Sequence, residues 1–516
     1  MTDKKSFDGD RSEARPKRSA GTSRPSERGG PRSDNRSNSR SGERTRSGER
    51  SFDRSSDRRG KPDANKSRAP RRDGERSNSD FSGPQLTKGK STSARGVTLA
   101  LLMEVVRNKL TLDEAIAESR YFSRLAERDR RFARQLSTTV LRRFGQLNRE
   151  LVGYLETPLP PKLLSIKILL LMGMAEHFFM RSPSHALVSE NVALARDDRS
   201  MRNHHGLVNA ILRKVSDRPQ HDICSPRFNI PKWMAARWNA AYGDAWLEAL
   251  SKTMTQTPGL DLALKPGAEG PDGEHQVLPN GALRYPTGLG TIENLPGFEN
   301  GDWWVQDAAA QMPVQMMGDV AGKRVLDLCA APGGKTMQLA AQGAQVTALD
   351  ISENRLERLK QNLERCKLEA EIVACDALEY EPSEKFDAIL LDAPCSATGT
   401  LRRHPELFGQ RKEDTLLHNR RLQAKLLGKA VKWLKPGGIL VYAVCSLEPE
   451  EGVEQVKAGL KALPITLDTD ILDSEATTPD WLSALWTTPG MLQTYPQTWA
   501  DLGGLDGFFA ARLRLT

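Results

Sequence analysis

The stretch Arg324-Val-Leu-Asp-Leu-Cys-Ala-Ala-Pro-Gly-Gly-Lys-Thr336 leads from a short apolar segment into a turn of small residues and then into a helical pattern. Small residues allow backbone N–H groups to approach a ligand closely, and the N-terminus of a helix favours a negatively charged group. The stretch therefore predicts a strand, a ligand-binding loop and a helix, which together form the first unit of an α/β fold.

Short apolar segments continue to alternate with helical patterns after this loop. Continuous apolar runs separated by helices are typical of strands that are buried on both faces of a parallel sheet. We therefore expect a doubly wound, Rossmann-like α/β core over residues 321–516. Its strands are predicted at 325–328, 345–349, 370–374, 388–391 and 438–444.

The part of the chain before this core divides by composition into three pieces. Residues 1–94 are rich in Arg, Ser, Gly, Asp and Pro and nearly lack apolar side chains, so we expect a disordered tail. Residues 95–218 repeat apolar side chains at helical spacing, which predicts a small all-α domain. Residues 219–320 combine a helical pattern with short strand-like pieces and turns, which predicts a small α+β subdomain.

The charge distribution indicates a possible RNA partner. The net charge of +9 is concentrated in the first 90 residues, and the remaining residues are close to neutral. Arginine side chains in a disordered arm can pair with RNA phosphates and release counterions. A solvated tail without a fixed role is the equally good alternative.

Cysteine usage and hydropathy exclude several classes of protein. The six cysteines form no CxxC pair, which argues against a disulfide scaffold and a four-thiolate zinc site, so we expect no metal. The most apolar stretch, 163–180, is interrupted by Lys167 and Glu176 and is at the short limit for a membrane span. We expect a buried helix there and a cytoplasmic monomer without a membrane partner.

The loop after the first strand discriminates among three classes of cofactor. A dinucleotide site requires G-x-G-x-x-G, which is absent, and a phosphate-binding P-loop requires glycine where Cys329 stands. S-adenosylmethionine, which carries a carboxylate and no phosphate, remains. We expect it to be bound by Cys329, Ala330, Ala331, Pro332, Gly333, Gly334 and Lys335.

Acidic residues follow successive predicted strands. Asp350 ends the second strand, Asp376 follows the third and Asp392 ends the fourth. A carboxylate about 20 residues after a glycine-rich loop can accept hydrogen bonds from ribose hydroxyls. A single Asp at such a place is usually a turn or cap residue, but three in order favour a cofactor site.

Two cysteines also follow strands of the predicted core. Cys395 comes after the fourth strand and Cys445 after the fifth, so both are expected at the rim where ligands bind. A free cysteine is more often a small buried hydrophobe, and that interpretation is kept for Cys224, Cys366 and Cys375. Two thiols at one rim suit chemistry on cytosine, because thiolate addition at C6 activates C5 to accept a methyl group.

Three motifs together resemble the NOL1/NOP2/Sun family of RNA cytosine-5 methyltransferases. They are Asp327-Leu-Cys-Ala-Ala-Pro-Gly-Gly-Lys-Thr336, Asp392-Ala-Pro-Cys-Ser-Ala-Thr-Gly399 and Cys445-Ser446, within a match that spans about 300–516. The helical segment 96–218 resembles the NusB-like RNA-binding domain. This pairing is typical of bacterial members of the family that methylate a cytosine in small-subunit (16S) rRNA.

The resemblance implies a role for each motif. Cys445 would be the nucleophile that bonds to C6, and Cys395 would assist release of the methylated product. Asp392 could hydrogen-bond the base edge. The loop with Asp350, Asp376 and Asp392 would bind S-adenosylmethionine in a class I methyltransferase core. Arg402-Arg-His-Pro405 could position phosphates or the target base, with a solvated loop as the alternative.

One residue departs from the family pattern, and two other functions remain open. The family usually has Thr before the nucleophile, whereas this chain has Val444, so a hydroxyl near the thiol is missing. The same chemistry on tRNA is one alternative. A ribosome-assembly factor that binds rRNA without catalysis is the other, although the presence of both cysteines and all three aspartates argues against it.

Overall fold

The computed structural model describes residues 93–288, 290–469 and 480–516. The disorder predicted for the tail therefore lies outside the described residues. The first part of the described chain is built from helices alone and has no strand between 93 and 253. These helices are α1 (Ala94–Met103), α2 (Leu112–Glu118), α3 (Glu127–Arg142), α4 (Phe144–Gly153), α5 (Leu164–Phe178), α6 (Ser184–Asp197) and α7 (His205–Ser216).

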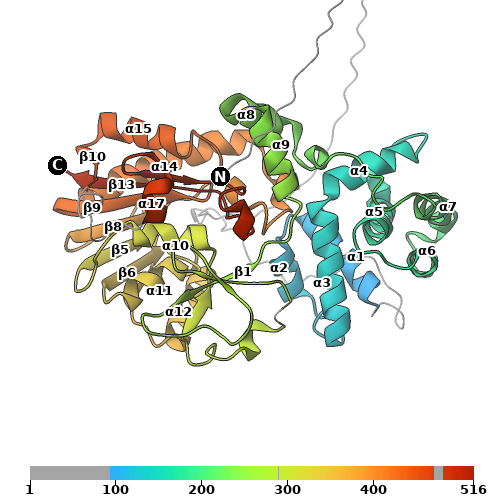
Figure 1. The fold of residues 1–516 in the computed structure, drawn as a ribbon, viewed down its shortest axis with the longest axis horizontal. Helices are drawn as coiled ribbons and strands as arrows, with labels where there is room; N and C mark the ends of the chain where they lie inside the picture. The colour runs from blue at the N-terminus through green and yellow to red at the C-terminus, as the bar shows by residue number, and fades with distance from the viewer. Residues whose placement is uncertain (1–92, 289, 470–479) are drawn as a thin grey trace, which may run out of the picture. The chain divides into compact units, whose positions relative to one another are not determined.

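Helix α5 forms the centre of this helical part (Figure 1). It carries the apolar stretch noted in the sequence, and its residues from Ile168 to Phe178 are buried. It packs against α1, α3, α4, α6 and α7. The buried Glu176 accepts hydrogen bonds from Arg95 and Asn191, which compensates its charge. Among the described helices, none combines the length and apolarity needed to cross a membrane.

A small antiparallel sheet follows two further helices, α8 (Lys232–Tyr242) and α9 (Asp244–Thr253). Its strand order is β2-β3-β1-β4, and Leu262 of β1 lies opposite Leu283 of β3 and Val305 of β4. Helix α10 (Ala308–Gln315) begins directly after this sheet and leads to the main sheet. The four strands are β1 (Leu260–Leu264), β2 (Gln276–Val277), β3 (Leu283–Tyr285) and β4 (Trp303–Val305).

The main sheet has the strand order β11-β12-β13-β9-β8-β5-β6-β7, and β10 pairs with β13. Strands β9, β8, β5, β6 and β7 are parallel, and the order reverses between β5 and β8. Its bounds are β5 (Arg324–Leu328), β6 (Gln345–Asp350), β7 (Glu371–Ala374), β8 (Phe386–Asp392), β9 (Leu434–Val444), β10 (Ile465–Leu467), β11 (Trp486–Thr488), β12 (Met491–Thr494) and β13 (Phe508–Leu515).

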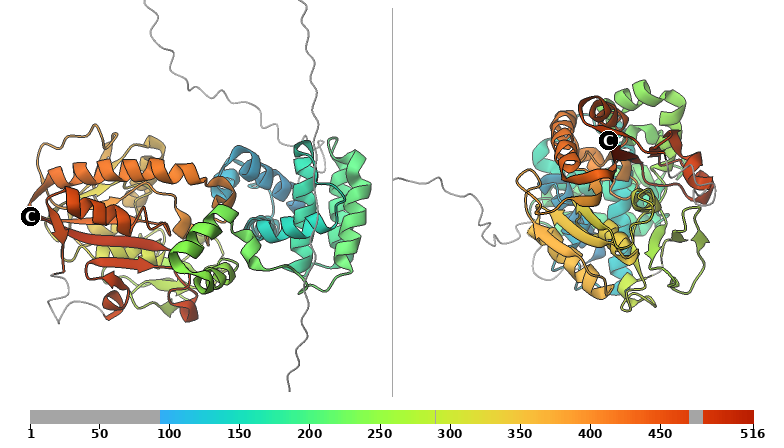
Figure 2. Two further views of the ribbon diagram at one scale, coloured as in Figure 1. Left: turned by 90° about the horizontal axis from the view of Figure 1, so that it is seen from above. Right: turned by 90° about the vertical axis from the view of Figure 1, so that its left-hand side faces the viewer.

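Helices cover both faces of this sheet (Figure 1 and Figure 2). Alternate residues of one strand belong to different apolar layers: Leu326 packs towards α14 and α15, whereas Val325 packs towards α10 and α11. The doubly wound core, the small α+β part and the all-α part predicted from the sequence are thus confirmed. The helices of the core are α11 (Gly334–Ala341), α12 (Glu353–Arg365), α13 (Leu407–Gln410), α14 (Glu413–Trp433), α15 (Val453–Ala462) and α17 (Asp480–Ala484).

The antiparallel strands β11 to β13 are the main feature of the core that the sequence pattern did not predict. β13 pairs with β9 along its length, so that Phe509 lies opposite Val444. Both side chains are fully buried in the same apolar layer. The end of β9, which leads to Cys445, is therefore held between a parallel and an antiparallel neighbour.

Candidate functional site

The loop 329–335 connects β5 to α11 at the strand ends where ligands bind in open α/β sheets. Cys329 has a positive φ of 68°, and the backbone N–H groups of Cys329 and Ala330 both donate to the carbonyl of Leu349 in β6. Gly333 has a φ of 105°, and a Cβ there would lie 2.7 Å from the side chain of Leu359. The small residues thus allow a tight turn against α12.

Burial decides the chemical state of the cysteine in this loop. It raises the pKa of Cys329 far above the ordinary value, and the nearby carboxylate of Asp350 adds to the effect. The thiol of Cys329 therefore stays protonated. This agrees with the expectation that Cys329 contributes backbone and shape rather than a nucleophile.

The three predicted aspartates have different surroundings. Asp350 is buried and accepts hydrogen bonds from Ala331 N in the loop (3.2 Å) and from the guanidinium of Arg355 (2.7 Å). Asp376 is half-buried and accepts from Leu378 N (2.8 Å) in the turn after β7. Asp392 stands at the end of β8 and accepts from Lys335 Nζ (2.7 Å). The structure thus joins Asp350 and Asp392 to the loop, while Asp376 closes its own turn.

A pocket of about 390 Å³ opens beside the loop. It is lined by residues 329–332, Gly334, Lys335 and Asp392, and its opposite wall includes Phe298 and Trp304 from the segment that carries the small sheet. Asp350 and Asp376 are not part of this lining. A wider groove of about 1010 Å³ lies along α12, β6 and β7 and contains none of the predicted site residues, so we assign the candidate site to the smaller pocket.

A second carboxylate, Asp327, also lines the pocket. It is fully buried in β5, and its Oδ2 accepts from the hydroxyl of Thr336 (2.6 Å). Its Oδ1 finds no hydrogen-bond partner within the described part of the chain. Burial raises the pKa of Asp327 to about 6, against the opposing effects of Thr336 and Lys335.

Lys335 is the positive charge of the site. Burial lowers the pKa of Lys335, but the carboxylates of Asp392 and Asp327 outweigh it and raise the pKa above its usual value. The side chain therefore stays a cation, and Cys445 lies close enough to interact with it electrostatically.

The two cysteines that follow β8 and β9 meet at this rim. The Sγ atoms of Cys395 and Cys445 are 3.5 Å apart. The hydrogen bond with Cys445, together with burial and the charges of Glu451 and Asp392, raises the pKa of Cys395 well above its ordinary value. Cys395 therefore carries its proton. Of the cysteines, only Cys329 lines the pocket, and Cys395 and Cys445 lie outside its lining, as do Cys224, Cys366 and Cys375.

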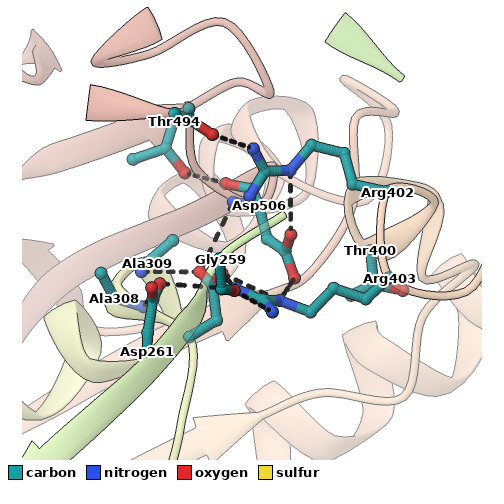
Figure 3. A network of polar contacts seen from close by, with 12 residues as sticks. Gly259, Asp261, Ala308, Ala309, Thr400, Arg402, Arg403, Thr494 and Asp506 are labelled. Carbon is teal, nitrogen blue, oxygen red and sulfur yellow. Dashed lines mark hydrogen bonds and ion pairs between the residues drawn. The ribbon is translucent and has the colours of Figure 1, made fainter. Parts of the chain in front are cut away.

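The two arginines after the Cys395 motif form ion pairs within the protein: Arg402 is buried, whereas Arg403 is half-buried. Arg402 is buried and donates to Gly503 O (2.7 Å), with Asp506 at 3.4 Å. Arg403 pairs with Asp307 (2.5 Å). It also pairs with Asp506 (3.3 Å), and Figure 3 shows this second pair. A buried guanidinium requires such partners, so Arg402 has a structural role inside the protein.

This ion network joins three segments that are far apart in the sequence. Asp307 is the N-cap of α10, and Asp506 precedes β13. Asp261 of β1 accepts from Arg403 at 3.4 Å (Figure 3) and from Arg284 at 2.6 Å. Burial and the nearby Asp307 raise the pKa of Asp506 to about 6. The network ties the loop after Cys395 to the small sheet.

The segment after Cys445 has its own anchors in α8, which the sequence did not predict. Trp238 Nε1 donates to Glu448 (2.9 Å), and Tyr242 OH donates to Leu447 O (2.6 Å). Arg237 pairs with Glu448 and Glu450. The acidic residues within 448–451 are the sequence feature that could have indicated these anchors, because buried carboxylates require hydrogen-bond donors from elsewhere in the chain.

Comparisons with known proteins agree with this arrangement. Residues 314–514 match the family model described as 16S rRNA methyltransferase RsmB/F, and residues 92–217 match the NusB family. The ribosomal RNA small subunit methyltransferase B of Vibrio cholerae serotype O1 is 33% identical over 417 residues, which cover 75% of this chain and 93% of that protein. The protein of the same name from Cronobacter sakazakii is 32% identical over 446 residues, covering 82% and 99%.

The fold is similar to that of a solved structure as well. The crystal structure of PH0851 superimposes with a TM-score of 0.65 at 20% identity and covers 82% of this chain and 98% of that chain. At this identity the similarity concerns the fold alone. The relatives above are matched over nearly their whole length. The chain therefore belongs to the ribosomal RNA small subunit methyltransferase B family of S-adenosylmethionine-dependent RNA methyltransferases.

Proposed function

We propose that this chain transfers a methyl group to C5 of a cytosine in small-subunit rRNA, through a covalent bond between Cys445 and C6 of the base. The observation that carries the proposal is the 3.5 Å separation of the Cys395 and Cys445 sulfurs, beside Lys335 and Asp392. The substrate is supported by the names of the relatives, which are ribosomal RNA small subunit methyltransferases.

The chemistry explains the need for a thiolate. C5 of cytosine is too weak a nucleophile to take a methyl group unaided. When the Cys445 thiolate adds to C6, the electron pair of the C5–C6 bond moves to C5, which can then attack an electrophilic methyl carbon. Loss of the C5 proton to a base then expels the sulfur from C6. The product regains its ring double bond, and Cys445 returns as a thiolate.

The charges around the two sulfurs support a division of roles. Lys335 is a cation that interacts electrostatically with Cys445. Cys395 faces the carboxylates of Glu451 and Asp392, which favour its protonated form. This agrees with the roles that the family resemblance implies, with Cys445 as nucleophile and Cys395 in product release. Asp392 is proposed to hydrogen-bond the base edge.

The residues of the pocket fit S-adenosylmethionine, which supplies the electrophilic methyl group when bound. Its ammonium and ribose hydroxyls need acceptors, and the buried Oδ1 of Asp327 is one without a partner among the described residues. Asp350 and Asp376 do not line this pocket, and their proposed contacts with the cofactor, those of Asp350 with the ribose hydroxyls, rest on the family resemblance. The N–H groups at the start of α11 suit its carboxylate.

The helical part is proposed to dock RNA, since it matches the NusB family.

A comparison of wild type with one variant tests the proposed function. Wild type and Cys445→Ala are incubated with S-adenosylmethionine labelled in its methyl group and with 30S subunits or 16S rRNA, and bisulfite sequencing locates the product. We expect one methylated cytosine with wild type and none with Cys445→Ala. Transfer that survives in Cys445→Ala would overturn the covalent mechanism, and a product in tRNA alone would change the substrate.

A further inference from the structure

Glu451 is a buried carboxylate that lies behind the two thiols. It follows Cys445 in the segment between β9 and α15, and it is completely excluded from solvent. The ion pairs found among the described residues do not include it. A buried charge of this kind is costly unless hydrogen-bond donors surround it, so its contacts are informative.

The donors to Glu451 come from the residues that directly follow the two cysteines. Ser396 donates its hydroxyl to Oε2 (2.5 Å) and its backbone N–H to Oε1 (2.9 Å). Ser446 donates its hydroxyl to the same Oε2 (2.6 Å), and the two serine hydroxyls are 3.1 Å apart. One carboxylate oxygen therefore joins the Cys395-Ser396 segment after β8 to the Cys445-Ser446 segment after β9.

Further contacts fix the carboxylate itself. Asn419 and Gln423 of α14 donate their side-chain amides to Oε1 at 3.1 and 3.3 Å. The backbone carbonyl of Glu451 accepts from the hydroxyl of Tyr442, which belongs to β9 (2.6 Å). Because α14 packs directly on β8 and β9, these hydrogen bonds fix the position of Glu451 relative to the main sheet.

We infer that Glu451 is a positioning residue, which holds both Cys-Ser segments so that the two sulfurs meet at one base. The inference rests on the proposed function, since it assigns Glu451 to the same reaction. The neighbouring Glu448 differs in its contacts: its carboxylate binds Trp238 and Arg237 of α8. Glu451 alone of the two receives the hydroxyls of both serines.

A glutamine at this position keeps the hydrogen bonds of Glu451 and removes its negative charge. Its amide group can donate to both serine hydroxyls, which rotate to accept, while its oxygen still accepts from Ser396 N and α14. Glu451→Gln should therefore keep kcat within about threefold of wild type. Glu451→Ala removes every contact of the carboxylate, and we expect kcat to fall about 100-fold, since a displacement near 1 Å has that effect. KM for S-adenosylmethionine should not change in either variant, because Glu451 does not line the pocket.

The distance between the sulfurs can be followed without measuring activity. Diamide, an azodicarbonyl oxidant, takes up two electrons and two protons as the Cys395 and Cys445 thiols join in a disulfide. Peptide mass spectrometry then gives the rate of that bond. We expect equal rates in wild type and Glu451→Gln, and a rate about tenfold lower in Glu451→Ala. Equal rates in all three proteins, or a Gln variant as slow as the Ala variant, would overturn the inference.

Controls separate this role from general stability and from the proposed function. Asp468→Asn removes another buried carboxylate, whose partners are Arg512 and Arg514, and should leave both readouts unchanged. If Glu451→Ala fails to fold, Ser446→Ala removes one link with a smaller change and should also slow both reactions. An active Glu451→Ala protein beside an inactive Cys445→Ala protein refutes only the inference. An active Cys445→Ala protein refutes the proposed function.

Discussion

The ammonium nitrogen of Lys335 lies 2.7 Å from Oδ2 of Asp392, so the loop after β5 and the end of β8 share one ion pair. Both side chains are largely withdrawn from solvent, and the aromatic ring of Phe508 lies 5.1 Å from the same ammonium group. The pair stands where the strand order of the sheet reverses, which is the place where open α/β sheets bind their ligands.

Replacing this lysine should remove the positive charge of the site. Lys335→Met keeps the length of the side chain but loses its charge, so Asp392 loses its partner and the electrostatic interaction with Cys445 is lost. We expect single-turnover methyl transfer to fall about 100-fold, as when one electrostatic group is removed from an active site. Lys435→Met is the matched control, because Lys435 also pairs with an aspartate, Asp387, at 2.7 Å. Loss of activity in both variants would contradict a specific role.

Cys395→Ala should trap the enzyme on its RNA. Addition of Cys445 to C6 and methyl transfer can still proceed, whereas release of the product stalls. Denaturing gels should therefore show a slowly migrating protein–RNA species that requires Cys445. Cys375→Ala changes a half-buried cysteine after β7, whose thiol donates to Asp376 O, and should show none. If Cys395→Ala forms no adduct, then either the roles of Cys395 and Cys445 are exchanged or Cys395 has no role in product release.

The sequence predicted the parts of the site that short motifs encode. The loop 329–335 and the two cysteines each follow a strand, and the parallel order of the strands brings them to one rim. Asp392 was predicted for the same reason, whereas its ion pair with Lys335 depends on side-chain conformations that spacing does not specify. Asp376 follows a strand too, but the pocket beside the loop does not reach it.

The rest of the site required contacts between distant segments. Arg402 and Arg403 were expected either to position RNA or to lie in a solvated loop, because they directly follow the Cys395 motif. Their true partners, Asp307 and Asp506, are 96 and 104 residues away in the chain, and only the fold brings them together. Strands β11 to β13 were missed because antiparallel strands at the end of a parallel sheet add no alternation of strand and helix.

Substitution of Gly399 should disrupt the site through the backbone. A Cβ at this position would lie 1.8 Å from Gly507 O and 3.0 Å from Cys445 O, and Gly399 N donates to that same Cys445 carbonyl. We expect Gly399→Ala to lower the free energy of unfolding by about 3 kcal/mol or more, because buried backbone atoms must move apart. Methyl transfer should be lost as well, since the shift displaces Cys445.

A second glycine provides the control for this substitution. A Cβ on Gly409 in α13 would have no neighbour within 4 Å, so Gly409→Ala should fold and methylate like wild type. Urea unfolding and single-turnover transfer measured on both variants test the difference. Equal stability of Gly399→Ala and Gly409→Ala would show that the contact between the Cys395 and Cys445 loops is not tight.

Asp327 should make the protein less stable as the pH rises from about 4 to about 6. Burial raises its folded-state pKa from 3.8 to about 6, so in this range the folded protein binds a proton that the unfolded chain has released. The neutral carboxyl contributes about 3 kcal/mol to the free energy of unfolding. This contribution is fully present below pH 4 and is lost above pH 6. Asp327→Asn cannot titrate. The unfolding free energy of wild type, measured relative to Asp327→Asn by urea titration at each pH, should therefore decline across this window, whereas a constant difference would mean that Asp327 is already ionised at pH 4.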